Sequence, residues 1–242
     1  MIATNDPIRL PDGFVERGHN VTRIEAFVDA AFAFAVTLLV IASNSVPTSF
    51  EEMIQALKGV PAFAASFAQI MMFWSAHALW SRRFGLDDRR SQRLSLVMVF
   101  LVLVYVYPLK ILFGGLFYWI SGGWLPPVAE IHSLLDLKLM FVMYGLAFGT
   151  LSLCMAGLYR EALKAEARPA LDPFEFSATR DEILRWRYHA VVAVLSVLVA
   201  LLLPAGAPRW MHGVPGLMYA LLSFTHLVVR RFGGGMRDGS RS

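Results

Sequence analysis

Six long apolar stretches, separated by shorter polar segments, make up most of the chain. Each is close to the roughly 20 residues that an α-helix needs to cross about 30 Å of hydrocarbon. Their residues do not alternate between apolar and polar with period two, which argues against membrane-spanning strands. The stretches are 24–41, 60–80, 94–113, 139–159, 188–203 and 211–229. The pattern predicts an all-α polytopic membrane protein, with six transmembrane helices in a single domain that covers residues 1–242.

The polar segments carry signals for where helices begin and end. Residues 1–22 contain no apolar core of a signal peptide, so the first stretch is expected to stay as a helix. Pro173 interrupts helix in the segment 160–187, and Thr179 followed by Glu182 predicts a capping box that starts the fifth helix early. Pro108 is expected to kink the third helix, and no other span shows a clear break.

Basic residues are distributed unevenly between the two sides. Four alternate segments, from the N-terminus to Arg23, 82–93, 160–187 and 230–241, hold 18 of the 22 lysines and arginines. The positive-inside rule places these segments in the cytoplasm. Both termini are then cytoplasmic, which requires an even number of spans. Residues 1–22, 160–187 and 230–242 are predicted to be cytoplasmic segments.

Composition supports the membrane class and argues against several others. Apolar residues make up 57% of the chain and charged residues only 17%. The net charge of +4 does not indicate nucleic-acid binding, because the basic residues sit at the ends of helices. A single cysteine, Cys154, offers no disulfide framework. We see no nucleotide-binding loop, no Cys/His cluster spaced for a metal and no nucleophile–base arrangement, so neither a cofactor nor enzymatic activity is expected.

The first helix carries an acidic residue at a depth where charge is costly. Asp29 lies six residues, or roughly 9 Å, beyond Arg23. A carboxylate there costs a few kcal/mol unless it is paired or hydrated. Trp74 and His77 of the second helix are three residues apart, share a face, and lie in the same leaflet as Asp29. We expect their ring N–H groups to bond the carboxylate.

A second face of the same helix is apolar. At about 100° per residue, one stripe contains Phe27, Ala30, Phe34, Thr37 and Ile41. Asp29 lies about 140° from Phe34 and so points elsewhere. The small residues Ala30 and Ala33 favour close packing between helices over contact with lipid alone.

These residues resemble the signature of the endosomal and lysosomal potassium channels of the transmembrane-protein-175 type and their bacterial and archaeal single-repeat relatives. Arg23, Phe27 and Asp29 match an Arg-x-x-x-Phe-Ser-Asp motif, and Trp74 with His77 resembles a Trp-x-x-His element. The pattern that follows the motif also matches, at Phe32, Ala33, Ala35, Thr37, Leu38 and Leu39.

The resemblance implies a homotetrameric, multi-pass protein of a bacterial or archaeal cell membrane that conducts potassium ions. Its pore would be lined by the first helix, with Phe34 at the constriction and Thr37 and Ile41 forming further layers. Arg23, Asp29, Trp74 and His77 would form a structural and gating network. The Thr-Val-Gly-Tyr-Gly filter of other potassium channels is absent from the sequence. Membrane lipid and potassium are then the expected partners.

Two positions depart from the family pattern. Val28 stands where the signature has serine, and Phe34 is larger than the isoleucine or leucine usual at the constriction. Four phenylalanines around an axis would either close the pore tightly or attract a cation to their rings.

A second interpretation of the same residues is an ion-coupled transporter. It would use Asp29, Glu25, His77 and His226 as a proton relay and would need a binding site near the middle of the membrane. A non-conducting structural protein is a further alternative.

Overall fold

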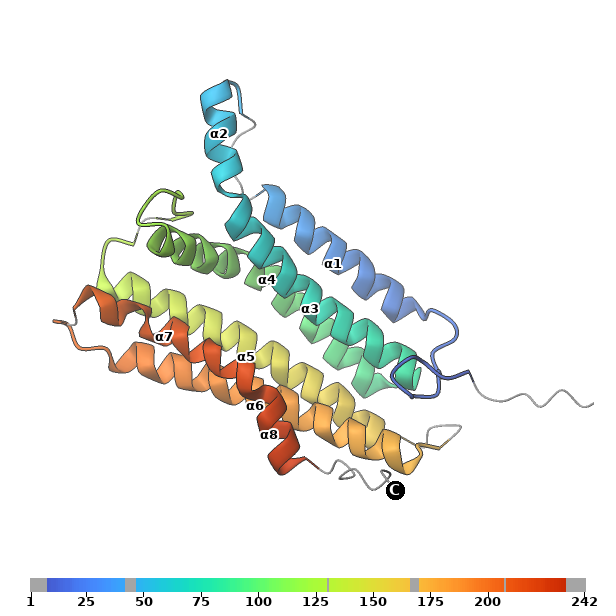
Figure 1. The fold of residues 1–242 in the computed structure, drawn as a ribbon. Coiled ribbons are helices and arrows are strands. Elements are labelled where there is room, and N and C mark those ends of the chain that lie inside the picture. Colours follow the sequence, from blue (N-terminus) through green and yellow to red (C-terminus); the bar gives the residue numbers. More distant parts are fainter. Residues whose placement is uncertain (1–7, 42–46, 130, 166–169, 207, 234–242) are drawn as a thin grey trace, which may run out of the picture.

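The computed structural model describes residues 8–41, 47–129, 131–165, 170–206 and 208–233. These residues contain six helical runs that are long and apolar enough to cross a membrane, which confirms the prediction of a six-helix, all-α fold. The runs lie side by side in a bundle (Figure 1). They are α1 (Arg23–Ile41), α3 (Val60–Phe84), α4 (Arg89–Ile120), α5 (Leu134–Lys164), α6 (Pro173–Leu202) and the segment Met211–Phe232.

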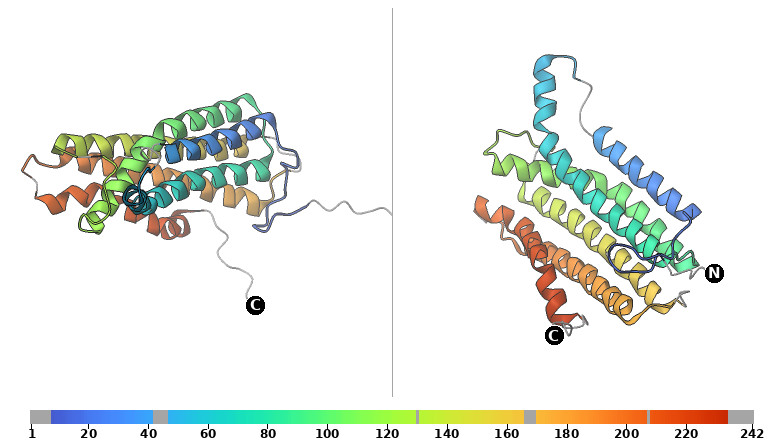
Figure 2. Two further views of the ribbon diagram at one scale, coloured as in Figure 1. Left: turned by 90° about the horizontal axis from the view of Figure 1, so that it is seen from above. Right: turned by 45° about the vertical axis from the view of Figure 1, so that its right-hand side comes forward.

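The order of packing places the first helix at an edge of the bundle. α5 and α6 pack on each other along most of their length, and α4 packs on α5. α1 packs on α3 and α4, far from the last helical run, which lies against α6 at the opposite edge (Figures 1 and 2). The aromatic core between α3, α5 and α6 includes Phe73, whose ring stands 5.7 Å from that of Phe148 and 5.6 Å from that of Trp186. One face of α1 is therefore free of contacts within the subunit.

The segment 160–187, expected to be a cytoplasmic loop, is mostly helical. α5 continues to Lys164 and α6 begins at Pro173. The capping box that starts α6 is Asp172 with Glu175, and the predicted box at Thr179 is wrong. Asp172 accepts a 2.8 Å hydrogen bond from the Glu175 amide, and Glu175 accepts one of 3.0 Å from the Asp172 amide. Thr179 lies inside the helix and donates to the carbonyl of Glu175.

The helix α4 is also longer than its apolar stretch. It has 32 residues, which corresponds to about 48 Å, and it continues through Pro108. Asp88 starts it by accepting hydrogen bonds from the amides of Arg90 and Ser91. The ribbon of α4 bends along its length (Figure 2), as expected where a proline interrupts the backbone hydrogen bonds of a helix.

The sixth span differs from the expectation of a regular helix. It is composed of η1 (Arg209–Gly213), α7 (Val214–Leu217), η2 (Met218–Phe224) and α8 (Thr225–Phe232), so 3-10 and α-helical turns alternate. Irregular turns leave backbone carbonyls without helical partners, and such groups need other donors inside a membrane. Side chains of α6 supply them: Ser196 donates to the Pro215 carbonyl and Tyr188 to the Leu221 carbonyl, each at 2.8 Å.

A short helix that the pattern of apolar stretches does not predict precedes α3. This helix, α2 (Phe50–Lys58), is capped by Ser49, whose hydroxyl accepts a hydrogen bond from the Glu52 amide. It stands apart from the bundle (Figure 1), and Lys58 at its end lies over the ring of Trp124 at 5.3 Å. Its exposed apolar residues, Phe50, Met53, Ile54 and Leu57, recur at helical spacing on one face.

The polar N-terminal segment is folded over the helix ends. We call residues 8–22 the N-terminal strap. Phe14 of the strap is 1% exposed and packs edge-on against Phe84 of α3 and Phe174 of α6, with ring centroids 6.0 Å apart in both pairs. Arg83 of α3 lies over the same ring at 4.2 Å. The strap therefore joins the ends of α3 and α6 immediately before the chain enters α1.

Candidate pore-lining face of the first helix

The first helix has one buried and one exposed face within the subunit. Val28, Phe32, Ala35 and Leu39 are at most 1% exposed and pack against α3 and α4. The stripe singled out from the sequence is the opposite face. Its five members are exposed in the subunit: Phe27, Ala30, Phe34, Thr37 and Ile41.

The exposed stripe is predominantly apolar and aromatic. Phe27 is 52% exposed, Phe34 54% and Ile41 69%. The single hydroxyl on the stripe, that of Thr37, donates to the Ala33 carbonyl at 3.0 Å. This bond orients the oxygen and leaves its lone pairs free to accept from water or contact a cation. The face thus presents bulky apolar side chains, with the Thr37 hydroxyl between Phe34 and Ile41.

The carboxylate of Asp29 bonds to the second transmembrane helix. The indole Nε1 of Trp74 donates to Oδ1 of Asp29 at 2.8 Å, as the sequence analysis expected. Hydrogen bonds between side chains of neighbouring helices contribute to helix association inside a membrane. The bond between Trp74 and Asp29 ties α1 to α3 on the side away from Phe34.

His77, the other expected partner, has a different bond. Its Nε2 lies 2.9 Å from Oγ of Ser95 in α4, and the ring is buried. Among the described residues, Trp74 is therefore the donor to Asp29, and His77 joins α3 to α4 instead. The sequence shows that both rings share a face of α3 but not which neighbouring helix each one meets.

The start of α1 is fixed by a capping box. Glu25 accepts a hydrogen bond of 2.5 Å from the Thr22 amide, and the Thr22 hydroxyl accepts one of 3.3 Å from the Glu25 amide. Arg23, the first residue of the helix, is exposed. Among the described residues, Glu25, Asp29 and His77 thus form hydrogen bonds with three different partners.

A buried lysine near the far end of α1 was missed as a site residue. Lys110 of α4 is 6% exposed, and its Nζ donates to the carbonyl oxygen of Leu39 at 3.4 Å. Lys110 is one of the four basic residues that lie outside the predicted cytoplasmic segments, and the charge count alone does not mark it as a site residue. The position of Lys110 inside an apolar stretch could have identified it as a site residue, because ionisable residues at membrane depth mark functional or structural sites.

A polar network deeper in the bundle connects α3, α4 and α5. Gln69 of α3 donates to the hydroxyl of Tyr144 at 2.9 Å and to that of Tyr105 at 3.2 Å. Tyr105 lies on α4 and Tyr144 on α5. The helices behind α1 are therefore held together by hydrogen bonds as well as by packing.

The N-terminal strap brings ionic contacts to the base of α1. Arg17 forms an ion pair of 2.7 Å with Glu175, and both side chains are almost fully buried. Arg9 forms an exposed pair of 3.3 Å with Asp172. Hydrogen bonds from the Glu175 backbone and from Arg9 hold the pKa of Asp172 below its ordinary value. The segment that leads into α1 is thus anchored to the start of α6.

The fold and this site define a polytopic α-helical membrane protein whose N-terminal helix presents an uncovered apolar face. The family model of the endosomal/lysosomal potassium channel TMEM175 matches residues 23–108, which include α1 and α3. A curated potassium channel of Marivirga tractuosa is 34% identical over 206 residues, 82% of either chain. The chain belongs to this family.

Solved structures agree with this assignment. A crystal structure of a variant of the potassium channel MtTMEM175, in complex with a nanobody fusion protein, is 31% identical in sequence. It superposes with a TM-score of 0.77 over 93% of this chain and 98% of that one. A homologue, from Chamaesiphon minutus, of the lysosomal potassium-selective channel TMEM175 has the same fold at 19% identity. Its TM-score is 0.57, with coverage of 86% and 96%.

Proposed function

We propose that the chain forms a homotetrameric, potassium-permeable cation channel in a bacterial or archaeal cell membrane. The exposed stripe of α1 would line the pore in each subunit. The observation that carries the proposal is the position of this stripe: its aromatic and apolar residues are exposed in one subunit, while the opposite face of the same helix is buried. The relatives are named as potassium channels, which supports potassium as the permeant ion.

The stripe offers an ordered series of layers to a central pore. Thr37 lies about 4.5 Å and Ile41 about 10.5 Å beyond Phe34 along the helix axis, and Phe27 lies about 10.5 Å before it. Phe34 would form the narrowest ring, because it is the bulkiest side chain near the middle of the stripe. Such an apolar ring favours a dry, closed pore, and conduction requires that the four helices move apart.

The rest of the subunit supports this arrangement. α1 is attached to the rest of the subunit by its buried face and by two polar contacts, the bond between Asp29 and Trp74 and the contact between Lys110 and Leu39. Val28, which replaces the signature serine, is fully buried against the bundle. In this protein the packing of Val28 takes the place of a hydroxyl contact. We assign Asp29 and Trp74 a structural and gating role rather than a role in selecting the ion.

Flux into liposomes tests the proposal. Purified protein is reconstituted, a potassium gradient is imposed, and uptake of potassium and then of sodium is followed over a range of concentrations. A channel gives passive flux that rises with the gradient and is larger for potassium. Flux that saturates at low concentration and requires a proton gradient would instead favour the transporter interpretation.

A further inference from the structure

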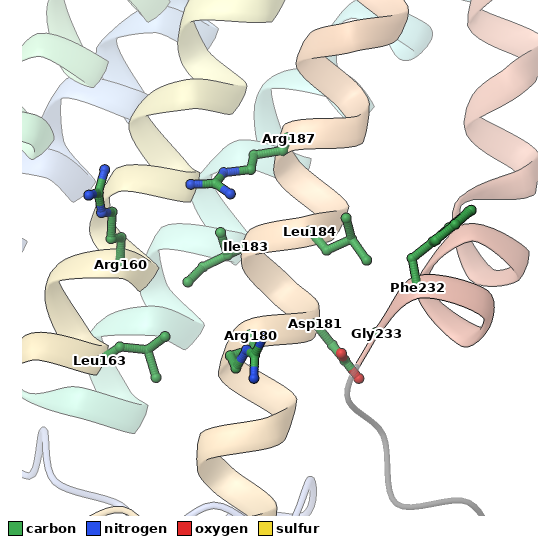
Figure 3. A pocket seen from close by; sticks show the side chains of 9 residues that line it. All are labelled: Arg160, Leu163, Arg180, Asp181, Ile183, Leu184, Arg187, Phe232 and Gly233. Carbon is green, nitrogen blue, oxygen red and sulfur yellow. The ribbon is translucent and has the colours of Figure 1, made fainter.

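A basic pocket lies at the end of the bundle that carries the strap, far from the proposed pore. It has a volume of about 370 Å³ and lies between the ends of α5, α6 and α8. Three arginines line it: Arg160 from α5, with Arg180 and Arg187 from α6 (Figure 3). Apolar side chains, among them Leu163, Leu184 and Phe232, complete the lining.

The three arginines are exposed and have no ion pair among the described residues. Other basic residues at this end do have acidic partners: Arg90 and Lys164 pair with Glu161, and Arg185 pairs with Glu182. One carboxylate, that of Asp181, also lines the pocket, but it packs against Gly233 on the side of α8 (Figure 3). The pocket therefore presents an excess of positive charge, and guanidinium groups are well suited to phosphate.

With Leu202 taken as one boundary of the hydrocarbon layer, Arg180 and Arg187 lie near the level expected for lipid headgroups at the other boundary. Counted back from Leu202, at the far end of α6, Arg187 is about 22 Å along the helix and Arg180 about 33 Å. The hydrocarbon layer is about 30 Å thick, so the two residues bracket its boundary. A ligand held between them would sit at the membrane surface.

An apolar surface leads from the pocket along the same face of α6. Arg180, Leu184, Arg187 and Val191 follow one another at helical spacing, and Val194 and Leu198 continue the face. Val191, Val194 and Leu198 are each about half exposed. A positive pocket that continues into an exposed apolar strip matches an amphiphile with an anionic head, whereas free phosphate would use only the pocket.

We propose that the basic pocket binds the phosphate headgroup of an anionic phospholipid, with the acyl chains along the exposed face of α6. Arg187 and Arg160 contact the phosphate from opposite sides of the gap between α5 and α6. Arg180 meets the part of the headgroup nearer to water. The inference does not depend on ion conduction, because it concerns a face of the subunit remote from α1.

Native mass spectrometry of the detergent-purified protein tests the site. The probe is dioctanoyl phosphatidylglycerol, and dioctanoyl phosphatidylcholine and sodium phosphate are added in parallel. The double variant Arg180→Gln/Arg187→Gln is compared with Arg89→Gln/Arg93→Gln, which removes two exposed arginines from α4 at the same end of the bundle. The single variant Arg187→Gln serves if the double variant is not obtained in folded form.

We expect phosphatidylglycerol to bind the wild type more tightly than phosphatidylcholine does. Each arginine near the membrane surface contributes about fivefold to binding, so the α6 double variant should bind phosphatidylglycerol roughly 25-fold more weakly and Arg187→Gln about fivefold more weakly. The α4 double variant should bind like the wild type. Equal binding of both lipids, unchanged binding by the α6 variant, or displacement of the lipid by millimolar phosphate alone would each overturn the proposal.

Discussion

Asp29 and Trp74 lie on two helices that are long and apolar enough to cross a membrane, and they are joined by a hydrogen bond. A carboxylate placed inside a membrane without a partner costs several kcal/mol, and the 2.8 Å bond from the indole nitrogen offsets part of that cost. The bond forms on the flank of α1, whereas Phe34 projects from the stripe. Stability and ion passage should therefore depend on different residues of one helix.

A double-mutant cycle measures the bond itself. Asp29→Asn, Trp74→Phe and the double variant should show a coupling free energy of about 1–2 kcal/mol in thermal or denaturant unfolding of the detergent-solubilised protein. Trp80→Phe on the same helix is the control, because the Trp80 indole nitrogen is buried and has no hydrogen-bond partner among the described residues. Its cycle with Asp29→Asn should give a coupling near zero. Equal coupling in both cycles would show that the effect comes from packing, not from the bond.

The same variants separate a structural role from a role in selectivity. We expect Asp29→Asn to lower stability while the ratio of potassium to sodium flux in folded protein stays as in the wild type. A changed ratio in a variant of unchanged stability would place Asp29 in the pore and contradict the orientation of α1 described above.

At the scale of the elements, hydropathy locates the spans well but not their ends. The six apolar stretches correspond to the six helical runs, because each had to be long enough to cross the membrane. Helix ends instead depend on local caps, and the box at Asp172 and Glu175 competes with that suggested by Thr179. α2 carries no long apolar run, so a search for spans could not detect it.

The side-chain partners, like the helix ends, could be predicted only in part. The pairing of Asp29 with Trp74 was predictable because both residues had to lie at one depth and needed a polar partner. The bond of His77 to Ser95 depends on the rotation of α3 relative to α4, which single-helix periodicity does not determine. The strap was expected to be only a polar segment, although Phe14 was available to pack and Arg17 to pair with Glu175.

The ion pair between Arg17 and Glu175 should anchor the strap. Removing one member of a buried pair leaves the other charge without compensation, so Arg17→Met should lower the free energy of unfolding by about 3 kcal/mol. Arg9→Met is the matched control within the strap, because the pair with Asp172 is exposed and its loss should cost less than about 1 kcal/mol. The denaturation midpoints of the two variants, compared with that of the wild type, measure both losses of stability. If the two variants were equally stable, the strap would not be held by this pair.

At the scale of the whole molecule, the distribution of charge predicts how the bundle crosses the membrane. Reporter fusions after Asp88 and after Trp124 should give opposite signals, with Asp88 in the cytoplasm, because arginine-rich segments remain inside. Asp88 precedes α4 and Trp124 follows it, so this pair of fusions tests a single crossing. Identical signals would mean that α4 does not span the membrane.

Assembly can be tested by crosslinking across the proposed axis. Thr37 lies on the exposed face of α1, and Leu198 lies on the exposed face of α6, 48% accessible, away from α1. With a short bifunctional thiol reagent, Thr37→Cys should give crosslinked subunits and Leu198→Cys should not. The native Cys154 is buried and should react little. Crosslinking through Leu198 alone would place α6, not α1, at the subunit interface.

The central claim is that the stripe of α1 lines an ion pore closed by Phe34, and flux through one pair of variants tests it most directly. Phe34→Ala removes an aromatic ring from the proposed constriction, whereas Phe100→Ala removes another exposed ring, from α4. Both variants are assayed in liposomes beside the wild type. We predict that Phe34→Ala raises cation flux several-fold and weakens discrimination of potassium over sodium, because a wider gap admits water. Phe100→Ala should behave like the wild type. Unchanged flux in folded Phe34→Ala tetramers, or the same increase in Phe100→Ala, would contradict the account.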